Sequence, residues 1–176
     1  MRKRLGVMCS GNGTNFENIV KSCWDHEVVL MIYNNKDCGA VQRATKYGIP
    51  SAYFTHKEEA KIINEFKWQK VDYIILAGWM RILSEGFIEA FPNRIINVHP
   101  SLLPKYKGLH AVEQAIHSKD KVTGCTVHYV NNELDGGEII QQAKVPIFDT
   151  DNTEILTKRI QREEYRILPE VIKKLP

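Results

Sequence analysis

The sequence predicts an α/β fold: a doubly wound, mostly parallel sheet with helices on both faces and an antiparallel addition in its C-terminal part. Two observations lead to this class. Short apolar runs without polar alternation recur along the first half of the chain, and helical patterns separate them. Continuous apolar strands of this kind are typical of parallel sheets that are covered on both faces.

The first half contains five strand patterns, each a short and mainly apolar run: Leu5–Cys9, Glu27–Tyr33, Ser51–Phe54, Tyr73–Ala77 and Ile95–His99. Helices are predicted between them, from about Phe16 to Cys23, Ala40 to Tyr47 and Glu58 to Trp68. Gly48 supports the end of the second helix, because glycine is favoured just past a helix C-terminus. This alternation of strand and helix is what a doubly wound sheet requires.

The second half departs from that alternation. Lys121–Val130 and Glu138–Val145 are predicted strands, and segment 131–137 between them is rich in turn residues. A short connection of this composition indicates neighbouring strands, which are expected to be antiparallel. A final helix is predicted from about Asn152 to Lys174. Pro169 is expected to kink or divide this helix.

Length and composition limit which classes of protein the chain can belong to. A chain of 176 residues with 43% apolar residues is expected to form one domain over residues 1–176. Lys and Arg exceed Asp and Glu by 24 − 21, or +3, which is too small an excess to predict nucleic-acid binding. The four cysteines show no metal-ligand spacing. We therefore predict reduced thiols and no metal site.

The sequence also gives no sign of a membrane protein. No apolar stretch approaches the roughly 20 residues that a membrane span needs. The N-terminus passes from charged residues directly into a strand pattern, with no signal-peptide core or cleavage site. We therefore expect a cytoplasmic protein.

A glycine-rich loop, Ser10-Gly11-Asn12-Gly13-Thr14-Asn15, connects the first predicted strand to the first helix. At this position of a doubly wound fold, backbone N–H groups and the helix N-terminus form an anion site. The loop lacks the spacing of dinucleotide-binding and P-loop motifs. A phosphate monoester therefore fits better than NAD or ATP, although an ordinary strand–helix turn remains the alternative.

A second motif, Asn97-Val98-His99-Pro100, ends the last strand of the first half. Asn97 and His99 are two residues apart on a strand, so their side chains share one face. They lie at the carboxyl end of the strand, where open α/β sheets bind ligands. A carboxamide and an imidazole can stabilise a developing oxyanion, and the imidazole can also deliver a proton. The alternative is a histidine that only satisfies a local hydrogen bond.

Two weaker motifs depend on context. Leu134-Asp135-Gly136-Gly137 is a common turn sequence, and it gains chemical meaning only if Asp135 folds back beside His99. A carboxylate there would favour the protonated imidazole. Segment 78–83 follows the fourth strand pattern, and its large apolar residues could line a pocket for a flat ring. Ordinary core packing is the alternative for this segment.

Four segments, taken in this order, are specific enough to indicate a protein family. They are SGNGTN at 10–15, LAGWMRIL at 76–83, INVHPSLLPKYKGLH at 96–110 and ELDGGEIIQQAKVPI at 133–147. On these segments the chain resembles the phosphoribosylglycinamide formyltransferases, which belong to the folate-dependent formyltransferase family. HPSLLP with a later Asp-Gly-Gly is shared across that family, and the GNGTN loop narrows the match. The resemblance implies a Rossmann-like fold and an enzyme of purine (IMP) biosynthesis.

Residue by residue, the resemblance implies a role for each motif. The N-terminal part would bind the phosphorylated substrate, and the C-terminal part would bind folate and carry catalysis. The implied substrate-binding residues are Gly13, Thr14, Asn15 and Glu164; the catalytic residues are Asn97, His99 and Asp135; and the folate-binding residues are Lys57, Met80, Arg81, Ile82, Leu83 and Asn97. The loop from Asn131 to Asp135 would cover the pterin. Lys57 stands where Arg is more usual, and Glu163 adjoins Glu164.

The resemblance also implies the reaction. The amine of glycinamide ribonucleotide attacks the formyl carbon of 10-formyltetrahydrofolate, the formyl-donor co-substrate, without a metal or a covalent enzyme intermediate. A monomer or homodimer is expected.

Three other interpretations stay open. Formyltetrahydrofolate hydrolase would use the same Asn, His and Asp with water as acceptor, but it usually carries an additional N-terminal domain. Methionyl-tRNA formyltransferase would need further RNA-binding structure. A non-catalytic phosphate- or folate-binding module would explain the loops but gives Asn97, His99 and Asp135 no shared purpose.

Overall fold

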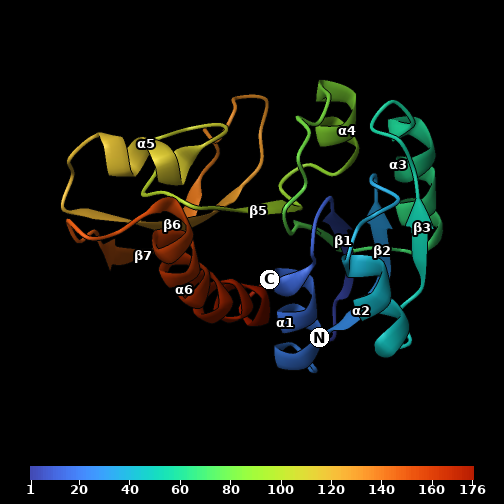
Figure 1. Ribbon diagram of the computed structural model, residues 1–176. Helices are drawn as coiled ribbons and strands as arrows, with labels where there is room; N and C mark the ends of the chain where they lie inside the picture. Colours follow the sequence, from blue (N-terminus) through green and yellow to red (C-terminus); the bar gives the residue numbers. More distant parts are fainter. The chain divides into compact units, whose positions relative to one another are not determined.

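The computed structural model describes residues 1–176, which divide into two compact units, Met1–Asn97 and Val98–Pro176. The strands form a seven-stranded sheet in the order β3-β2-β1-β4-β5-β6-β7 (Figure 1). Strand β5, Ile95–His99, contains the boundary between the two units. The predicted fold class, a mostly parallel sheet with an antiparallel C-terminal addition, is therefore confirmed, whereas the single-domain expectation stays a prediction.

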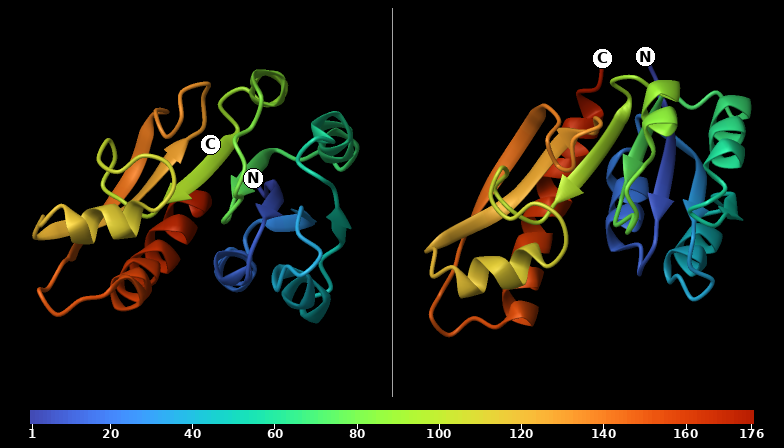
Figure 2. Two further views of the ribbon diagram at one scale, coloured as in Figure 1. Left: turned by 45° about the horizontal axis from the view of Figure 1, so that its top comes forward. Right: turned by 90° about the horizontal axis from the view of Figure 1, so that it is seen from above.

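The first unit is a parallel sheet with helices on both faces. Its elements in chain order are β1 Arg4–Cys9, α1 Thr14–Ser22, β2 Glu27–Tyr33, α2 Ala40–Lys46, β3 Ser51–Tyr53, α3 Glu59–Trp68, β4 Tyr73–Leu76 and α4 Glu85–Ala90. All of its strand pairs are parallel. The left view of Figure 2 shows α1 and α2 on one face of these strands and α3 and α4 on the other.

The core of the first unit lies along the central strands. Every residue of β4 is buried, as are the last five residues of β1. On one face, the ring centroid of Phe91 lies 6.3 Å from that of Phe66 in α3, in a T-shaped arrangement. It lies 5.7 Å from the ring centroid of Phe87 in α4. Aromatic pairs with this geometry add to the burial of their apolar area. They hold α3 and α4 together beside the sheet.

The second unit is an antiparallel strand pair with two helices. It contains α5 Ala111–His117, β6 Val122–Tyr129, β7 Ile139–Pro146 and α6 Thr153–Lys173. Strands β6 and β7 pair antiparallel, as their short connection predicted. The long helix α6 packs against both strands. Buried residues Ala143 and Val145 alternate with exposed ones on β7, which gives this strand one covered face.

Several element boundaries differ from the prediction. Helix α1 begins at Thr14, two residues before the expected start, and the short helices α4 and α5 were not predicted. Pro169 does not divide α6, which is continuous from Thr153 to Lys173. The reason is burial, because apolar residues on both sides of the proline, including Ile160 and Val171, are buried along the helix.

All four cysteines are buried and carry free thiols. Burial raises the pKa of the Cys125 thiol to about 12, with a smaller contribution from the nearby carboxylate of Glu164. No helix is long and apolar enough to cross a membrane.

The close approach of β6 and β7 generates a stability prediction at Gly124. A Cβ at this position would lie 1.9 Å from the backbone oxygen of Ala143, which cannot move aside without displacing β7. Gly124→Ala should therefore lower the free energy of unfolding by about 1–3 kcal/mol, as overpacking commonly does. Urea denaturation followed by circular dichroism measures this change.

Gly86→Ala is the matched control. Gly86 lies in α4, and the atom nearest to an added methyl group would be Ser84 Oγ at 3.9 Å. Alanine is favoured over glycine in a helix, so this variant should be neutral or slightly stabilised. Equal stability of Gly124→Ala and the wild type would contradict the tight strand contact.

Candidate active site

Three predicted site segments of the first unit end up at one edge of its sheet. The glycine-rich loop follows β1, segment 78–83 follows β4, and Asn97 lies on β5 opposite Leu76 of β4. Because β1, β4 and β5 run parallel, their carboxyl ends meet at the same edge. The sheet therefore assembles these segments at the edge where α/β folds bind ligands.

The glycine-rich loop presents the start of α1 as an anion site. Gly13 is the N-cap residue with φ 76°, a left-handed conformation that glycine adopts readily. Because α1 begins at Thr14, both Thr14 and Asn15 belong to its first turn, where the N–H groups point out of the helix end. These groups and the helix dipole favour a negatively charged ligand.

The carbonyl groups of this loop are held by the segment that begins α2. The Cys38 thiol and the Ala40 N–H both donate to the Gly11 carbonyl, at 2.8 and 3.3 Å. Arg43 Nε donates to the Asn12 carbonyl at 2.7 Å. The Gly11 and Asn12 carbonyls therefore accept hydrogen bonds from residues at the start of α2 and within it.

Segment 78–83 is divided between buried and exposed side chains. Trp79 and Leu83 are buried, whereas Met80 is 67% exposed and Ile82 is 77% exposed. Arg81 is exposed between them. Large apolar side chains that face solvent together are suited to cover an apolar ligand. Lys57 lies exposed in the turn before α3, after the end of β3.

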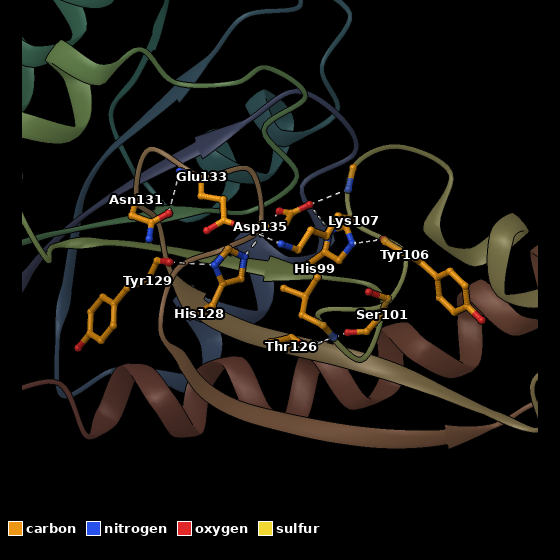
Figure 3. A network of polar contacts seen from close by, with 12 residues as sticks. His99, Ser101, Tyr106, Lys107, Thr126, His128, Tyr129, Asn131, Glu133 and Asp135 are labelled. Carbon is orange, nitrogen blue, oxygen red and sulfur yellow. Dashed lines mark hydrogen bonds and ion pairs between the residues drawn. The ribbon is translucent and has the colours of Figure 1, made fainter.

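The second unit brings Asp135 beside His99. His99 Nδ1 lies 3.5 Å from Asp135 Oδ2, and both side chains are 8% exposed. On the other side of the carboxylate, His128 Nε2 lies 3.8 Å from Asp135 Oδ1 (Figure 3). The backbone N–H of Gly108 donates to Asp135 Oδ2 at 2.7 Å. A buried carboxylate needs such partners to offset its lost hydration.

Both ring nitrogens of His99 face oxygen acceptors. Nε2 lies 2.8 Å from the carbonyl oxygen of Tyr106, and Nδ1 faces Asp135. A neutral imidazole can donate through only one nitrogen, whereas an imidazolium donates through both. Each ring nitrogen of His99 therefore has an oxygen atom within reach, one from Tyr106 and one from Asp135. Asn97 precedes it by two residues on β5, so the two side chains share one face of that strand.

The loop that carries Asp135 has a tightly turned backbone. Asp135 itself has φ 49°, and a Cβ on Gly137 would lie 1.7 Å from the Tyr129 carbonyl oxygen. Within the loop, Asn131 Oδ1 accepts from the Glu133 N–H at 2.9 Å. Lys107 forms an ion pair with Glu133 at 3.1 Å. Gly137 is therefore needed for the path of the chain, whereas Asp135 supplies the carboxylate that faces His99.

The structure gives Ser101 a structural position. Its hydroxyl is fully buried and donates to the Lys105 carbonyl at 2.5 Å, while its own carbonyl accepts from Thr126 Oγ1 at 2.7 Å. It thereby stiffens the loop after β5.

The two acidic candidates on α6 have different surroundings. Glu164 is buried on α6. Glu163 is partly exposed, and its carboxylate accepts from Arg166 at 2.6 Å. Charged residues are rarely buried without a purpose. Burial therefore distinguishes Glu164 from Glu163 as a candidate, which the sequence alone could not do.

A cavity of about 560 Å³ in the first unit lies away from these residues. It is lined in part by Arg2, Trp24, Glu27 and Gln69, which lie before or at the amino ends of the strands. None of the predicted site residues lines it. The carboxyl edge carries the convergent polar groups, so we assign the candidate site there. No group of three or more His, Cys, Asp or Glu side chains is placed to hold a metal ion.

Comparison with known proteins identifies the class. The formyl transferase family model matches residues 3–172, and the chain belongs to this family. Phosphoribosylglycinamide formyltransferase of Escherichia coli K12 is 40% identical over 94% of this chain and 84% of its own length. The trifunctional purine biosynthetic protein adenosine-3 of Drosophila melanogaster is 41% identical over 97% of this chain, which spans only 14% of that protein.

The structural comparison agrees with the sequence comparison. The crystal structure of glycinamide ribonucleotide transformylase 1 from Symbiobacterium toebii superposes with a TM-score of 0.95 at 38% identity, covering 98% of this chain and 86% of that one. These likenesses confirm the family resemblance that the four sequence motifs indicated.

Sequence reasoning missed His128. It lies on β6, is 2% exposed, and approaches the same carboxylate as His99. The available signal was a titratable side chain in a strand pattern that is mainly apolar, beside residues such as Val127. That signal is weak, because a histidine in such a strand often only satisfies a local hydrogen bond. Here Nδ1 does face the Tyr129 carbonyl oxygen at 2.9 Å.

The burial of His128 generates a pH prediction. Burial lowers the pKa of His128, and the proximity of His99 lowers it further, against the opposing effects of the Tyr129 carbonyl and Asp135. The unfolded chain then binds this proton more readily than the folded one. The stability contribution is full above the unfolded pKa of about 6.5 and is lost as the pH falls through the lower folded pKa.

His128→Gln should therefore reduce the loss of stability between pH 7 and pH 5, by up to about 1.4 kcal/mol per pH unit. Urea denaturation at a series of pH values measures this slope. His117→Gln is the matched control, because His117 is exposed on α5. If stability changes with pH equally in the wild type and in His128→Gln, then His128 has the same pKa in the folded and the unfolded chain.

Proposed function

We propose that this chain transfers the formyl group of 10-formyltetrahydrofolate to the amine of glycinamide ribonucleotide, in purine (IMP) biosynthesis. The products are formylglycinamide ribonucleotide and tetrahydrofolate. Membership of the formyl transferase family and the named relatives support this activity. The single observation that carries the chemistry is the buried pairing of Asp135 with His99.

In the proposed assignment, the glycine-rich loop binds the substrate phosphate through Gly13, Thr14 and Asn15. The first-turn N–H groups of α1 and the engaged carbonyls of Gly11 and Asn12 support this role. Glu164 is proposed to contact the substrate sugar. Its burial on α6 supports its choice over Glu163.

The folate is proposed to contact Lys57, Asn97 and segment 80–83, which contains Met80, Arg81, Ile82 and Leu83. The exposure of Met80 and Ile82 supports this role, because their apolar area becomes useful once a flat ring covers it. The loop from Asn131 to Asp135 is proposed to cover the pterin. No metal is assigned to the reaction.

The proposed reaction is a direct transfer. The substrate amine forms a bond to the formyl carbon, and negative charge develops on the former carbonyl oxygen. Asn97 and the protonated His99 donate hydrogen bonds to that oxygen, and loss of one such donor costs about 10²–10³ in rate. The bond from carbon to the folate nitrogen then breaks, while a proton passes from the amine to that nitrogen.

Asp135 is proposed to keep His99 protonated and oriented. The 2.7 Å hydrogen bond from Gly108 holds the carboxylate in place, so its charge acts on the ring from a fixed position. In the structure Nε2 of His99 contacts the Tyr106 carbonyl. We infer that the formyl oxygen replaces that carbonyl as the acceptor when substrates bind. Holding the amine and the formyl group together supplies much of the remaining acceleration.

The activity is tested by the release of tetrahydrofolate from 10-formyltetrahydrofolate, with and without glycinamide ribonucleotide. Release that requires the ribonucleotide, with an equal amount of formylated product, is expected. Release without it, together with formate, would instead identify a hydrolase. Binding of folate without release in either mixture would identify a binding module or another acceptor.

The roles of His99 and Asp135 generate a kinetic prediction. His99→Ala should lower kcat by about 10²–10⁴ while changing the KM of each substrate much less. Asp135→Asn keeps the size of the side chain but removes its charge, and should also lower kcat. Steady-state kinetics measure both effects, with His117→Ala on exposed α5 as the control. Full turnover by His99→Ala would remove this residue from the mechanism.

The glycine-rich loop generates a second prediction. A Cβ on Gly13 would lie 2.5 Å from the Ala40 Cβ, and the residue's φ is 76°. Gly13→Ala should therefore distort the anion site and raise the KM of the ribonucleotide, by about tenfold for a loss of 1.4 kcal/mol in binding. The KM of the folate should change little.

Gly11→Ala serves as the stability control for that variant, since a Cβ there meets nothing within 4 Å. Thermal unfolding of both variants separates strain in the fold from loss of binding. An unchanged KM for the ribonucleotide in Gly13→Ala would argue against phosphate binding by this loop.

A further inference from the structure

Ser10 connects two segments that come from different strands. It directly follows β1 and is 9% exposed. Its backbone N–H donates to the Gly78 carbonyl at 3.0 Å, and its Oγ accepts from the Met80 N–H at 2.9 Å. One residue at the end of β1 therefore binds both sides of the turn that follows β4.

The two bonds are placed where each segment leaves the sheet. Ser10 is the first residue of the glycine-rich loop, and Met80 is the first residue of the exposed part of segment 78–83. Gly78 has φ 79°, so the chain turns sharply at this point, and Trp79 is buried between the two bonded residues. The Gly78 carbonyl and the Met80 N–H of this turn therefore both bind Ser10.

Few other contacts determine where the exposed part of segment 78–83 lies. Met80, Arg81 and Ile82 are all exposed, so packing restrains them little. The far end is held separately, because the Ser84 N–H donates to Glu59 Oε1 at 3.0 Å and the Ser84 hydroxyl also contacts that carboxylate. At the near end, the hydrogen bonds of Ser10 act beside the buried side chain of Trp79, and Ser10 also belongs to the glycine-rich loop.

We propose that Ser10 is a positioning residue that sets the glycine-rich loop and segment 78–83 relative to each other, so that binding of both substrates depends on it. This proposal rests on the proposed function. Removal of the hydroxyl leaves the partly buried Met80 N–H without its acceptor, which a nearby polar group or water must then supply. The turn shifts, and because Ser10 begins the glycine-rich loop, the anion site shifts with it.

The test compares Ser10→Ala with Ser84→Ala, which removes a hydroxyl from the far end of the same segment. Ser84 caps α4 by accepting from the Phe87 N–H, so its loss lowers stability without reaching the glycine-rich loop. The KM of each substrate is measured with the other at saturation. Ser10→Ala is expected to raise both KM values about tenfold, as loss of one net hydrogen bond implies, and to lower kcat less.

Ser84→Ala is expected to leave the KM of the ribonucleotide unchanged. Ser10→Thr retains the hydroxyl and is expected to restore both KM values toward those of the wild type. Ser10→Cys preserves the size of the side chain but offers a weak acceptor, and is expected to raise both KM values less than alanine does. It also provides the comparison if Ser10→Ala does not fold.

Titration calorimetry with glycinamide ribonucleotide and with tetrahydrofolate tests binding apart from turnover. Weaker binding of both ligands supports the proposal. Weakening of only one ligand, or unchanged affinities with reduced thermal stability, would overturn it and leave Ser10 a residue of the fold alone. If the wild type binds both ligands but transfers no formyl group, the proposed function fails while the role of Ser10 in binding is still decided.

Discussion

A buried carboxylate needs hydrogen-bond donors or positive charge to replace its lost hydration. In the second unit, the buried carboxylate is that of Asp135. Its two oxygens are met by the Gly108 N–H and by the rings of His99 and His128. These partners come from β5, from the loop after it and from β6. One buried charge therefore determines how three separate parts of the unit converge on the loop that carries it.

The first unit depends on a different constraint, which is the direction of its strands. Because β1, β4 and β5 are parallel, every connection that leaves their carboxyl ends leaves the same edge of the sheet. The glycine-rich loop then needs only local restraints to become an anion site. The Cys38 thiol and Arg43 provide them by engaging carbonyl groups on the side of α2. Ser10 provides a further restraint toward the turn after β4.

Prediction from sequence succeeded where the signal was local. Strands β2 and β5 match their predicted bounds because each is a short and mainly apolar run, which the sequence pattern shows directly. Helices α4 and α5 were missed because six and seven residues show little of a helical period. Helix α2 is equally short but was predicted, because Gly48 just past its end supplied a second signal. At Pro169 the sequence predicted a kink or a division, and the helix is not divided, because burial along α6 outweighs the disruption that proline causes.

By itself the sequence determined the class of fold, the order of the binding motifs and the resemblance to folate-dependent formyltransferases. All three follow from residues that are neighbours along the chain. Only the tertiary structure decided that Asp135 lies against His99, that His128 shares its carboxylate, and that Ser10 binds the turn at Met80. These contacts join residues far apart in sequence, and they form because a folded interior must satisfy its buried polar groups.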